Sequence, residues 1–354
     1  IQGTSFAFIP IMLPFKAFGL GAIFTAAFIG GIFQIWIGKM LKPIRHMFPP
    51  LVTGIVVLMI GISLLKVGFK YAGGGVWLMN NKPEIFANWH HLTIAGTVLI
   101  VALLTNLKGK GMVSAASILI GIVAGFIVAA MLGEVRWEKI AAADWFALPM
   151  PLQYGIDFVW GAVILMLFMS IVTTIETIGD ISATTMGGAN REATNKELSG
   201  GIMADGVGTA FASIFNAMPN TSYSQNAGLV AFTGVISRHV GTVAGVILIL
   251  LGLFPKLGGV IAAMPDSVIG GAAIIMFGLI AGAGIKLISK AEMSQRNILI
   301  LSLSLSFGIG LYAFPEFVAH VPDLGIKLGL LLTTGLIPAG LLAFILNATL
   351  PNKK

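Results

Sequence analysis

The chain has 354 residues, of which 57% are hydrophobic and only 10% are charged. Soluble domains carry about 25% charged residues, so this composition excludes an ordinary soluble globular protein. The net charge of +7 is distributed among connections between long apolar segments, which indicates a membrane topology bias and no nucleic-acid partner. The chain contains no cysteine, so disulfide bonds and thiolate sites are excluded.

Apolar segments recur along the whole chain, and a helix of about 17–25 such residues is long enough to cross a bilayer. We expect spans at roughly 5–15, 18–37, 49–66, 92–107, 111–133, 158–186, 198–215, 226–238, 240–255, 268–289, 295–313 and 328–349. These segments predict an all-α polytopic membrane protein with about 12 spans in this chain. If the connections alternate between the two sides, most lysines and arginines fall on one side, which we expect to be cytoplasmic.

Two parts of the chain resemble each other at a constant offset. The sequence TSF at 4–6 aligns with TSY at 221–223, an offset of 217 residues, and the same offset aligns Gly54 with Gly271. The second copy has long apolar segments before its TSY motif, whereas their counterparts would precede residue 1. We therefore expect a repeat of seven plus seven spans, of which this chain lacks the first two helices. Because an odd number of spans inverts the second copy, the pattern is typical of secondary transporters with a substrate site at the midplane.

The TSF and TSY motifs are short polar runs next to apolar segments. Their β-branched and aromatic residues favour an extended backbone. Unwound backbone at membrane depth is tolerated only where it is buried in protein or lines a cavity. We therefore predict two short midplane β-strands, each leading into a half-helix whose N–H groups face a ligand.

Three acidic residues lie within predicted spans. Glu176 and Asp180 are four residues apart and share one face of the 158–186 helix, and Asp205 lies in the next span. A carboxylate at the bilayer centre costs about 2.5–3.5 kcal/mol on insertion scales. Pairing with a base or capping of a neighbouring helix is the alternative for the first two, and a hydrogen-bonded structural role is the alternative for Asp205. We interpret the three as facing a wet cavity that binds substrate and a proton.

Amide side chains follow the second polar motif. Gln225 and Asn226 both donate and accept hydrogen bonds, and a carboxylate such as Glu176 accepts from ring N–H groups. Together they match a small planar heterocycle, against whose faces Phe6, Phe8 or Tyr223 could pack, although plain core packing is the alternative for each ring. No histidine spacing predicts a metal site, and the chain has no phosphate-binding loop for ATP.

The run QNAGLVAFTG at 225–234 resembles the signature of the nucleobase–ascorbate transporter family, also called nucleobase:cation symporter-2. The runs ETIGDISATT and GGIMADG resemble the family's eighth and ninth membrane helices, and GTSFAF resembles the start of its third. The resemblance implies fourteen spans in two inverted repeats, divided into a core domain and a gate domain. In this chain the core would comprise 1–43 and 158–260, and the gate would comprise 44–157 and 261–354.

The resemblance also implies roles for individual residues. The positions implied to bind or lie near the substrate are Glu176, Gln225, Asn226, Phe6, Ser224 and Tyr223. The positions implied to support the site, couple protons or tune selectivity are Asp180, Asp205, Thr233, Gly228 and Gly234. Uracil-type members carry Glu and His where this chain has Gln225 and Asp180, so the chain resembles the purine branch. It departs from close bacterial purine relatives at Ala227, where they have a second Asn.

These observations predict a multi-pass transporter in the plasma membrane, the inner membrane of a bacterium. Its expected activity is proton-coupled uptake of a nucleobase. The resemblance implies that this nucleobase is a purine, xanthine or uric acid, and that the motion is elevator-like. No cofactor besides the coupling proton and no metal is expected, and homodimerisation through the gate domain is implied by the resemblance. The alternatives are a uracil:proton symporter, an inorganic-anion exchanger of the same fold, an ion channel and a membrane-embedded enzyme. The acidic pair disfavours an anion exchanger, and no nucleophile–base or metal set completes an enzyme site.

Overall fold

The computed structural model describes residues 2–40, 49–223, 230, 235–319 and 332–351. The described chain is mostly helical, with one pair of short strands. Six described helices are long and apolar enough to cross a membrane: α2 (Leu20–Lys39), α4 (Pro50–Ala72), α6 (Trp89–Lys108), α10 (Trp160–Ala189), α15 (Asp266–Ile288) and α16 (Gln295–Ala313). A seventh candidate is the bent pair of α13 (Arg238–Gly252) and α14 (Pro255–Ala263), whose axes differ by 77°.

The remaining elements are shorter or more polar. They are η1 (Phe6–Phe8), α1 (Ile9–Met12), η2 (Leu13–Phe18), α5 (Val76–Asn81), η4 (Pro83–Ile85), α7 (Met112–Ala115), α8 (Ser117–Met131), α9 (Trp137–Ala142), α11 (Asn195–Ile214), α17 (Glu316–Ala319) and α19 (Leu336–Thr349).

The described chain therefore has fewer full-length spans than the twelve expected. The segment predicted at 5–15 consists of short 3-10 and α-helical pieces, where Pro14 removes a backbone donor. The segment at 111–133 is divided into α7 and α8. Most of the predicted 226–238 span and the start of the 328–349 span lie outside the described residues.

The chain divides into two compact units. Unit 1 comprises 1–63, 150–227 and 280–354, and unit 2 comprises 64–149 and 228–279.

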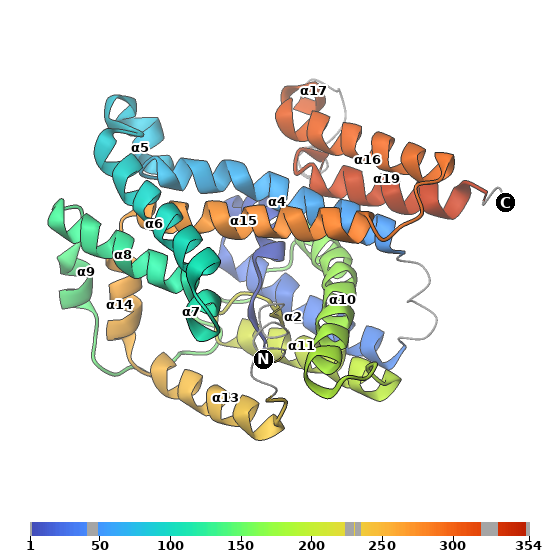
Figure 1. The fold of residues 1–354 in the computed structure, drawn as a ribbon, viewed down its shortest axis with the longest axis horizontal. Helices are drawn as coiled ribbons and strands as arrows, with labels where there is room; N and C mark the ends of the chain where they lie inside the picture. Colours follow the sequence, from blue (N-terminus) through green and yellow to red (C-terminus); the bar gives the residue numbers. More distant parts are fainter. Residues whose placement is uncertain (1, 41–48, 224–229, 231–234, 320–331, 352–354) are drawn as a thin grey trace. The chain divides into compact units, whose positions relative to one another are not determined.

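Within unit 1, α2 packs closely against both α10 and α11 (Figure 1). The contact with α11 requires glycine on both helices. A Cβ on Gly31 would lie 2.7 Å from the Gly206 carbonyl oxygen, and a Cβ on Gly206 would lie 2.6 Å from the Gly31 carbonyl oxygen. Such small interfacial residues let helix backbones approach within a membrane.

Two strands of unit 1 pair in an antiparallel manner. Strand β1 (Gln2–Thr4) pairs with β2 (Asn220–Ser222), with Gly3 opposite Thr221. The Ser5 N–H continues the pairing to the Pro219 carbonyl at 3.1 Å. Two short strands are thus present, as predicted, and they bring together segments more than two hundred residues apart. The first strand ends at Thr4, however, and Phe6 of the TSF motif already belongs to the 3-10 helix η1.

Unit 1 also contains the helix pair α16 and α19, which lie side by side (Figure 1). The Arg296 guanidinium donates to the carbonyls of Asn347 (2.6 Å) and Leu350 (3.0 Å) and so satisfies the last carbonyls of α19. The Tyr312 hydroxyl donates to the Ser63 carbonyl at 2.6 Å, which ties α16 to α4.

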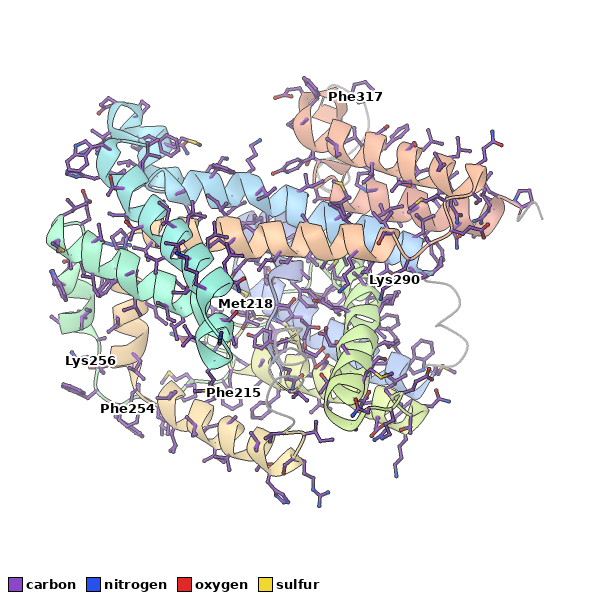
Figure 2. All side chains as sticks on the ribbon, in the orientation of Figure 1. Phe215, Met218, Phe254, Lys256, Lys290 and Phe317 are labelled. Carbon is purple, nitrogen blue, oxygen red and sulfur yellow. The ribbon has the colours of Figure 1, made fainter. Side chains whose placement is uncertain are left out.

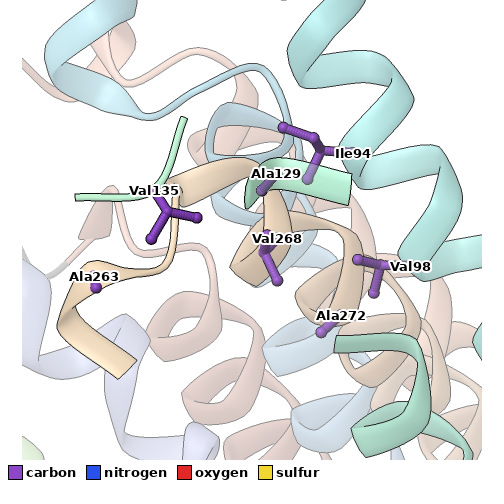
Figure 3. Close-up of a cluster of buried hydrophobic side chains, with 7 residues drawn as sticks. All are labelled: Ile94, Val98, Ala129, Val135, Ala263, Val268 and Ala272. Atoms are coloured by element: carbon purple, nitrogen blue, oxygen red, sulfur yellow. The ribbon is translucent and has the colours of Figure 1, made fainter. Parts of the chain in front are cut away.

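Unit 2 has its own apolar core between α6, α8, α15 and the end of α14. Figure 3 shows its buried side chains, which are Ile94, Val98, Ala129, Val135, Ala263, Val268 and Ala272. At one edge of the unit the Lys256 ammonium donates to the carbonyls of Ala141 (3.1 Å) and Ala143 (2.8 Å), which ties α14 to the end of α9 (Figure 2). The same ammonium lies 5.3 Å from the centre of the Trp145 ring.

Candidate functional site

The helices that carry the acidic residues are joined by a short, well-defined turn. α10 ends at Asn190, whose φ of 51° is left-handed, a conformation that asparagine tolerates. α11 then begins at Thr194, which forms a reciprocal capping box with Glu197. Arg191 donates two hydrogen bonds to the Glu197 carboxylate, and this pairing holds the pKa of Glu197 well below its usual range. The turn makes α10 and α11 antiparallel neighbours.

Asp205 connects three elements of unit 1. Its side chain is 3% exposed. Its Oδ2 accepts a hydrogen bond from the Thr177 hydroxyl of α10 at 2.5 Å and another from the Ser222 N–H of β2 at 3.2 Å. The aspartate of α11 therefore fixes both the neighbouring helix and the end of the strand.

Asp180 binds the same strand residue from α10. Its Oδ2 accepts a hydrogen bond from the Ser222 hydroxyl at 2.8 Å, and its side chain is 9% exposed. One serine is thus held by two carboxylates, its backbone by Asp205 and its hydroxyl by Asp180. Neither Ser222 nor Thr177 was among the predicted site residues, although the TSY motif and the threonines near the Glu176 face were visible in the sequence.

Glu176 differs from the two aspartates. Its side chain is half-buried on α10, and no described residue forms a hydrogen bond or ion pair with its carboxylate. Asp180 and Asp205 are close enough to interact with it electrostatically. Among the three acids, Glu176 is thus the one whose carboxylate accepts no hydrogen bond from the described residues.

The base of β2 is fixed to α11 by a hydroxyl. Thr209 Oγ1 accepts from the Asn220 N–H at 3.0 Å and donates to the Asn220 carbonyl at 3.1 Å. Buried Thr221 lies with its hydroxyl 3.5 Å from that of Thr177. These bonds satisfy the strand backbone within the protein, as a membrane interior requires.

Gln2 of β1 and Tyr223, which follows β2, complete the described site. The Tyr223 hydroxyl donates to the Thr4 carbonyl at 3.4 Å, and a side chain on Gly3 would collide with the tyrosine ring. The Tyr223 side chain is 39% exposed, so its ring has an accessible surface. The Gln2 amide of β1 donates to the Ala204 carbonyl at 3.3 Å.

The predicted site residues are therefore placed only in part. Ser224, Gln225, Asn226, Gly228, Thr233 and Gly234 lie outside the described residues, as does the side chain of Phe6. Phe8 is 1% exposed and belongs to the core, which corresponds to the packing alternative for that ring. Within the part of the chain that the structure describes, no group of three or more His, Asp or Glu side chains could hold a metal ion.

Comparison with known proteins identifies the family. Residues 1–317 match the model described as Permease family, Xan_ur_permease. The chain belongs to the xanthine/uracil permease family, nucleobase:cation symporter-2. It is 38% identical over 351 residues to the putative purine permease CPE0397 of Clostridium perfringens, covering 99% of this chain and 76% of that protein. It is 33% identical over 370 residues to the xanthine permease XanP of Escherichia coli, covering 100% of this chain and 78% of that protein.

The chain is also 33% identical over 349 residues to the uric acid permease PucJ of Bacillus subtilis, covering 98% of this chain and 77% of that protein. Among solved structures, it resembles the transmembrane domain of the cyanobacterial bicarbonate transporter BicA, with a TM-score of 0.51 and 17% identity over 98% of this chain and 84% of that one. It also resembles SLC26A9, with a TM-score of 0.57 and 17% identity over 82% of this chain and 48% of that one. At such identity the structural likeness concerns the fold alone. The predicted family is confirmed: the chain is a multi-pass membrane permease and not an enzyme.

Proposed function

We propose that this permease takes up a purine nucleobase, xanthine or uric acid, together with a proton. The observation that carries the proposal is the half-buried Glu176 carboxylate, which has no hydrogen-bond or ion-pair partner among the described residues. It lies in the same unit as β2 and the two aspartates that hold this strand. The names of the relatives at 33–38% identity, which include xanthine and uric acid permeases, support a purine as cargo.

In the proposed site, Glu176 accepts a hydrogen bond from a ring N–H of the purine. The amides of Gln225 and Asn226 pair with the remaining N–H and C=O edge, because an amide both donates and accepts. Phe6, two residues after β1, and Tyr223 and Ser224, which follow β2 in the sequence, contact the ligand. Asp180 and Asp205 keep β2 in place, and the acidic cluster carries the coupling proton. Thr233, Gly228 and Gly234 belong to the family signature, and we assign them to support of the site and to the tuning of its selectivity.

The motion we propose is elevator-like exchange between a core domain (1–43 and 158–260) and a gate domain (44–157 and 261–354) of a seven-plus-seven inverted repeat. Two features support the repeat. Helices α4 and α15 both have 23 residues, and their starts at Pro50 and Asp266 agree with the offset of 217 to within one residue. Strands β1 and β2 form one antiparallel pair from the two copies. A midplane site formed by both repeats is general for such transporters.

We further propose that the protein lies in a bacterial inner membrane and dimerises through the gate domain. The bacterial sources of the relatives support the location.

Uptake into proteoliposomes with an imposed pH gradient tests the proposal. The wild-type protein should accumulate radiolabelled xanthine or uric acid, and collapse of the gradient should stop accumulation. Glu176→Gln should abolish uptake at unchanged expression, whereas Glu192→Gln, the same change at an exposed loop position, should leave it intact. Normal purine uptake by Glu176→Gln would show that this carboxylate does not bind the substrate. Uptake of uracil or sulfate but not of purines would show that the proposed substrate class is wrong.

A further inference from the structure

Gln34 of α2 is a buried amide that the site described above does not use. Its side chain is 0% exposed, and within the described part of the chain neither Oε1 nor Nε2 has a hydrogen-bond partner. A glutamine amide can form four hydrogen bonds, and buried polar groups in proteins are nearly always paired with protein or with ordered water. A leucine or methionine would fill the same space without this requirement, so the amide needs an explanation.

The helix register places Gln34 toward α11 near Asp205. Gly31 lies one turn before Gln34, and a Cβ there would meet Gly206. Gly38 lies one turn after it and accepts a hydrogen bond on its carbonyl from the Ser199 hydroxyl at 2.7 Å. The two helices run antiparallel, so Gln34 lies between these levels, beside the turn of α11 that carries Asp205.

The same register places Gln34 toward the threonine-rich part of α10. The Ser170 hydroxyl donates to the Gly30 carbonyl at 3.1 Å, and Gly30 is one turn before Gln34. Five residues earlier on α2, the Thr25 hydroxyl accepts from the N–H of Asp157, which precedes α10. The contacts therefore advance in the same direction along both helices, so α2 and α10 are parallel. Gln34 therefore faces the next turn of α10, where buried Thr174 and Thr177 lie.

The hydroxyls of Thr173, Thr174 and Thr177, which form the layer of α10 next to Gln34, already donate their protons and can only accept further hydrogen bonds. Thr173 donates to the Met169 carbonyl (3.0 Å), Thr174 to the Ser170 carbonyl (2.7 Å) and Thr177 to Asp205 (2.5 Å). Their oxygens keep free lone pairs, which an amide N–H or a water could use. A water with two to four polar partners is a stable part of a protein interior.

We propose that Gln34 binds a buried water between α2, α10 and α11 and, through it, positions the Thr177–Asp205 pair. This inference rests on the proposed proton-coupled transport, because it gives Gln34 a task in holding the acid that couples the proton. The charged residues on the neighbouring turns of α10 and α11 are Glu176, Asp180 and Asp205, which interact with one another electrostatically. On α2 itself the only charged residue is Lys39, in its last turn.

The test compares Gln34→Met, which removes the amide but keeps the length, with Ile37→Val, which perturbs a fully buried apolar residue of the same helix. We expect Gln34→Met to fold and insert, to displace the pH profile of xanthine uptake and to lower its initial rate about tenfold or more, as misplacing a functional group does. Ile37→Val should leave the pH profile unchanged. If Gln34→Met does not fold, Gln34→Leu, which lacks the amide, is compared with Gln34→Asn, which keeps it.

A second readout needs no substrate. In pH-difference infrared spectra of the purified full-length protein, Asp205→Asn identifies the carboxyl C=O band of Asp205. Gln34→Met should shift this band and Ile37→Val should not. If the wild-type protein takes up no purine, the proposed function fails while the infrared band still tests Gln34. If Gln34→Met leaves both the pH profile and the band unchanged, the proposal for Gln34 is wrong.

Discussion

The hydrogen bond between Thr177 and Asp205 offers the sharpest test of the acidic cluster. Its donor and acceptor are 2.5 Å apart, Thr177 is 0% exposed and Asp205 is 3% exposed. A hydrogen bond to a charged group contributes about 1.5–3 kcal/mol. About 1.4 kcal/mol corresponds to a factor of ten. If Asp205 must be held in place for transport, Thr177→Val should therefore lower the ratio of the maximal uptake rate to KM by roughly 10- to 150-fold.

Thr173→Val is the matched control for this change. Thr173 is also 0% exposed and lies one turn earlier on the same helix, but among the described residues its hydroxyl donates only to the carbonyls of Met169 and Ser170. Those carbonyls already accept the backbone hydrogen bonds of the helix. Removing the Thr173 hydroxyl should therefore cost no more than about 0.5–1.5 kcal/mol, the usual net contribution of a neutral hydrogen bond. Initial-rate uptake and the melting temperature of both variants are compared. Equal effects of the two substitutions would refute the reasoning, since they would show that Asp205 needs no support from Thr177.

Three further predictions follow from contacts in unit 1. Gly206→Ala places a methyl group against the α2 backbone and should destabilise the protein by about 1–3 kcal/mol. The control Gly200→Ala on the same helix has open space around it and should be neutral or stabilising. Thermal melting compares the two variants, and equal melting temperatures would contradict the close packing of Gly206 against α2. Glu197→Gln should lower the melting temperature at neutral pH. Because the folded-state pKa of Glu197 is depressed by Arg191, its contribution is present above the ordinary glutamate range and is lost as the pH falls, so the difference from wild type should shrink in acid; a difference that grows in acid would reverse the sign. Tyr223→Phe should leave uptake nearly unchanged because the hydroxyl's hydrogen bond is long, and a large loss would show that the hydroxyl itself binds the ligand.

Much of the fold was predictable because long apolar helices follow composition and length. The spans predicted at 18–37 and 295–313 correspond closely to α2 and α16. The prediction was wrong at 5–15, where proline and the nearby strand interrupt the helix, and at 111–133, which is divided in two. Hydropathy does not encode where a chain bends, because the break depends on local backbone hydrogen bonding and on neighbouring helices.

The candidate site was predictable in its charges but not in its contacts. A carboxylate inside an apolar span stands out in a sequence, so Glu176, Asp180 and Asp205 could be selected without a structure. That two of them bind one residue, Ser222, could not be foreseen, because it depends on the depth of β2 between α10 and α11. The role proposed for Gln34 could not be predicted from the sequence either. It depends on the complete burial of this side chain, which only the structure shows.

Binding of a purine by this permease, which we propose above, can be measured as ligand-dependent thermal stability. A ligand that binds only the native state raises the melting temperature in a concentration-dependent way. For the purified full-length protein we predict an increase with xanthine or uric acid and none with uracil or sulfate, and Glu176→Gln should remove it. An increase with uracil or with sulfate alone, and none with either purine, would show that the site does not bind purines.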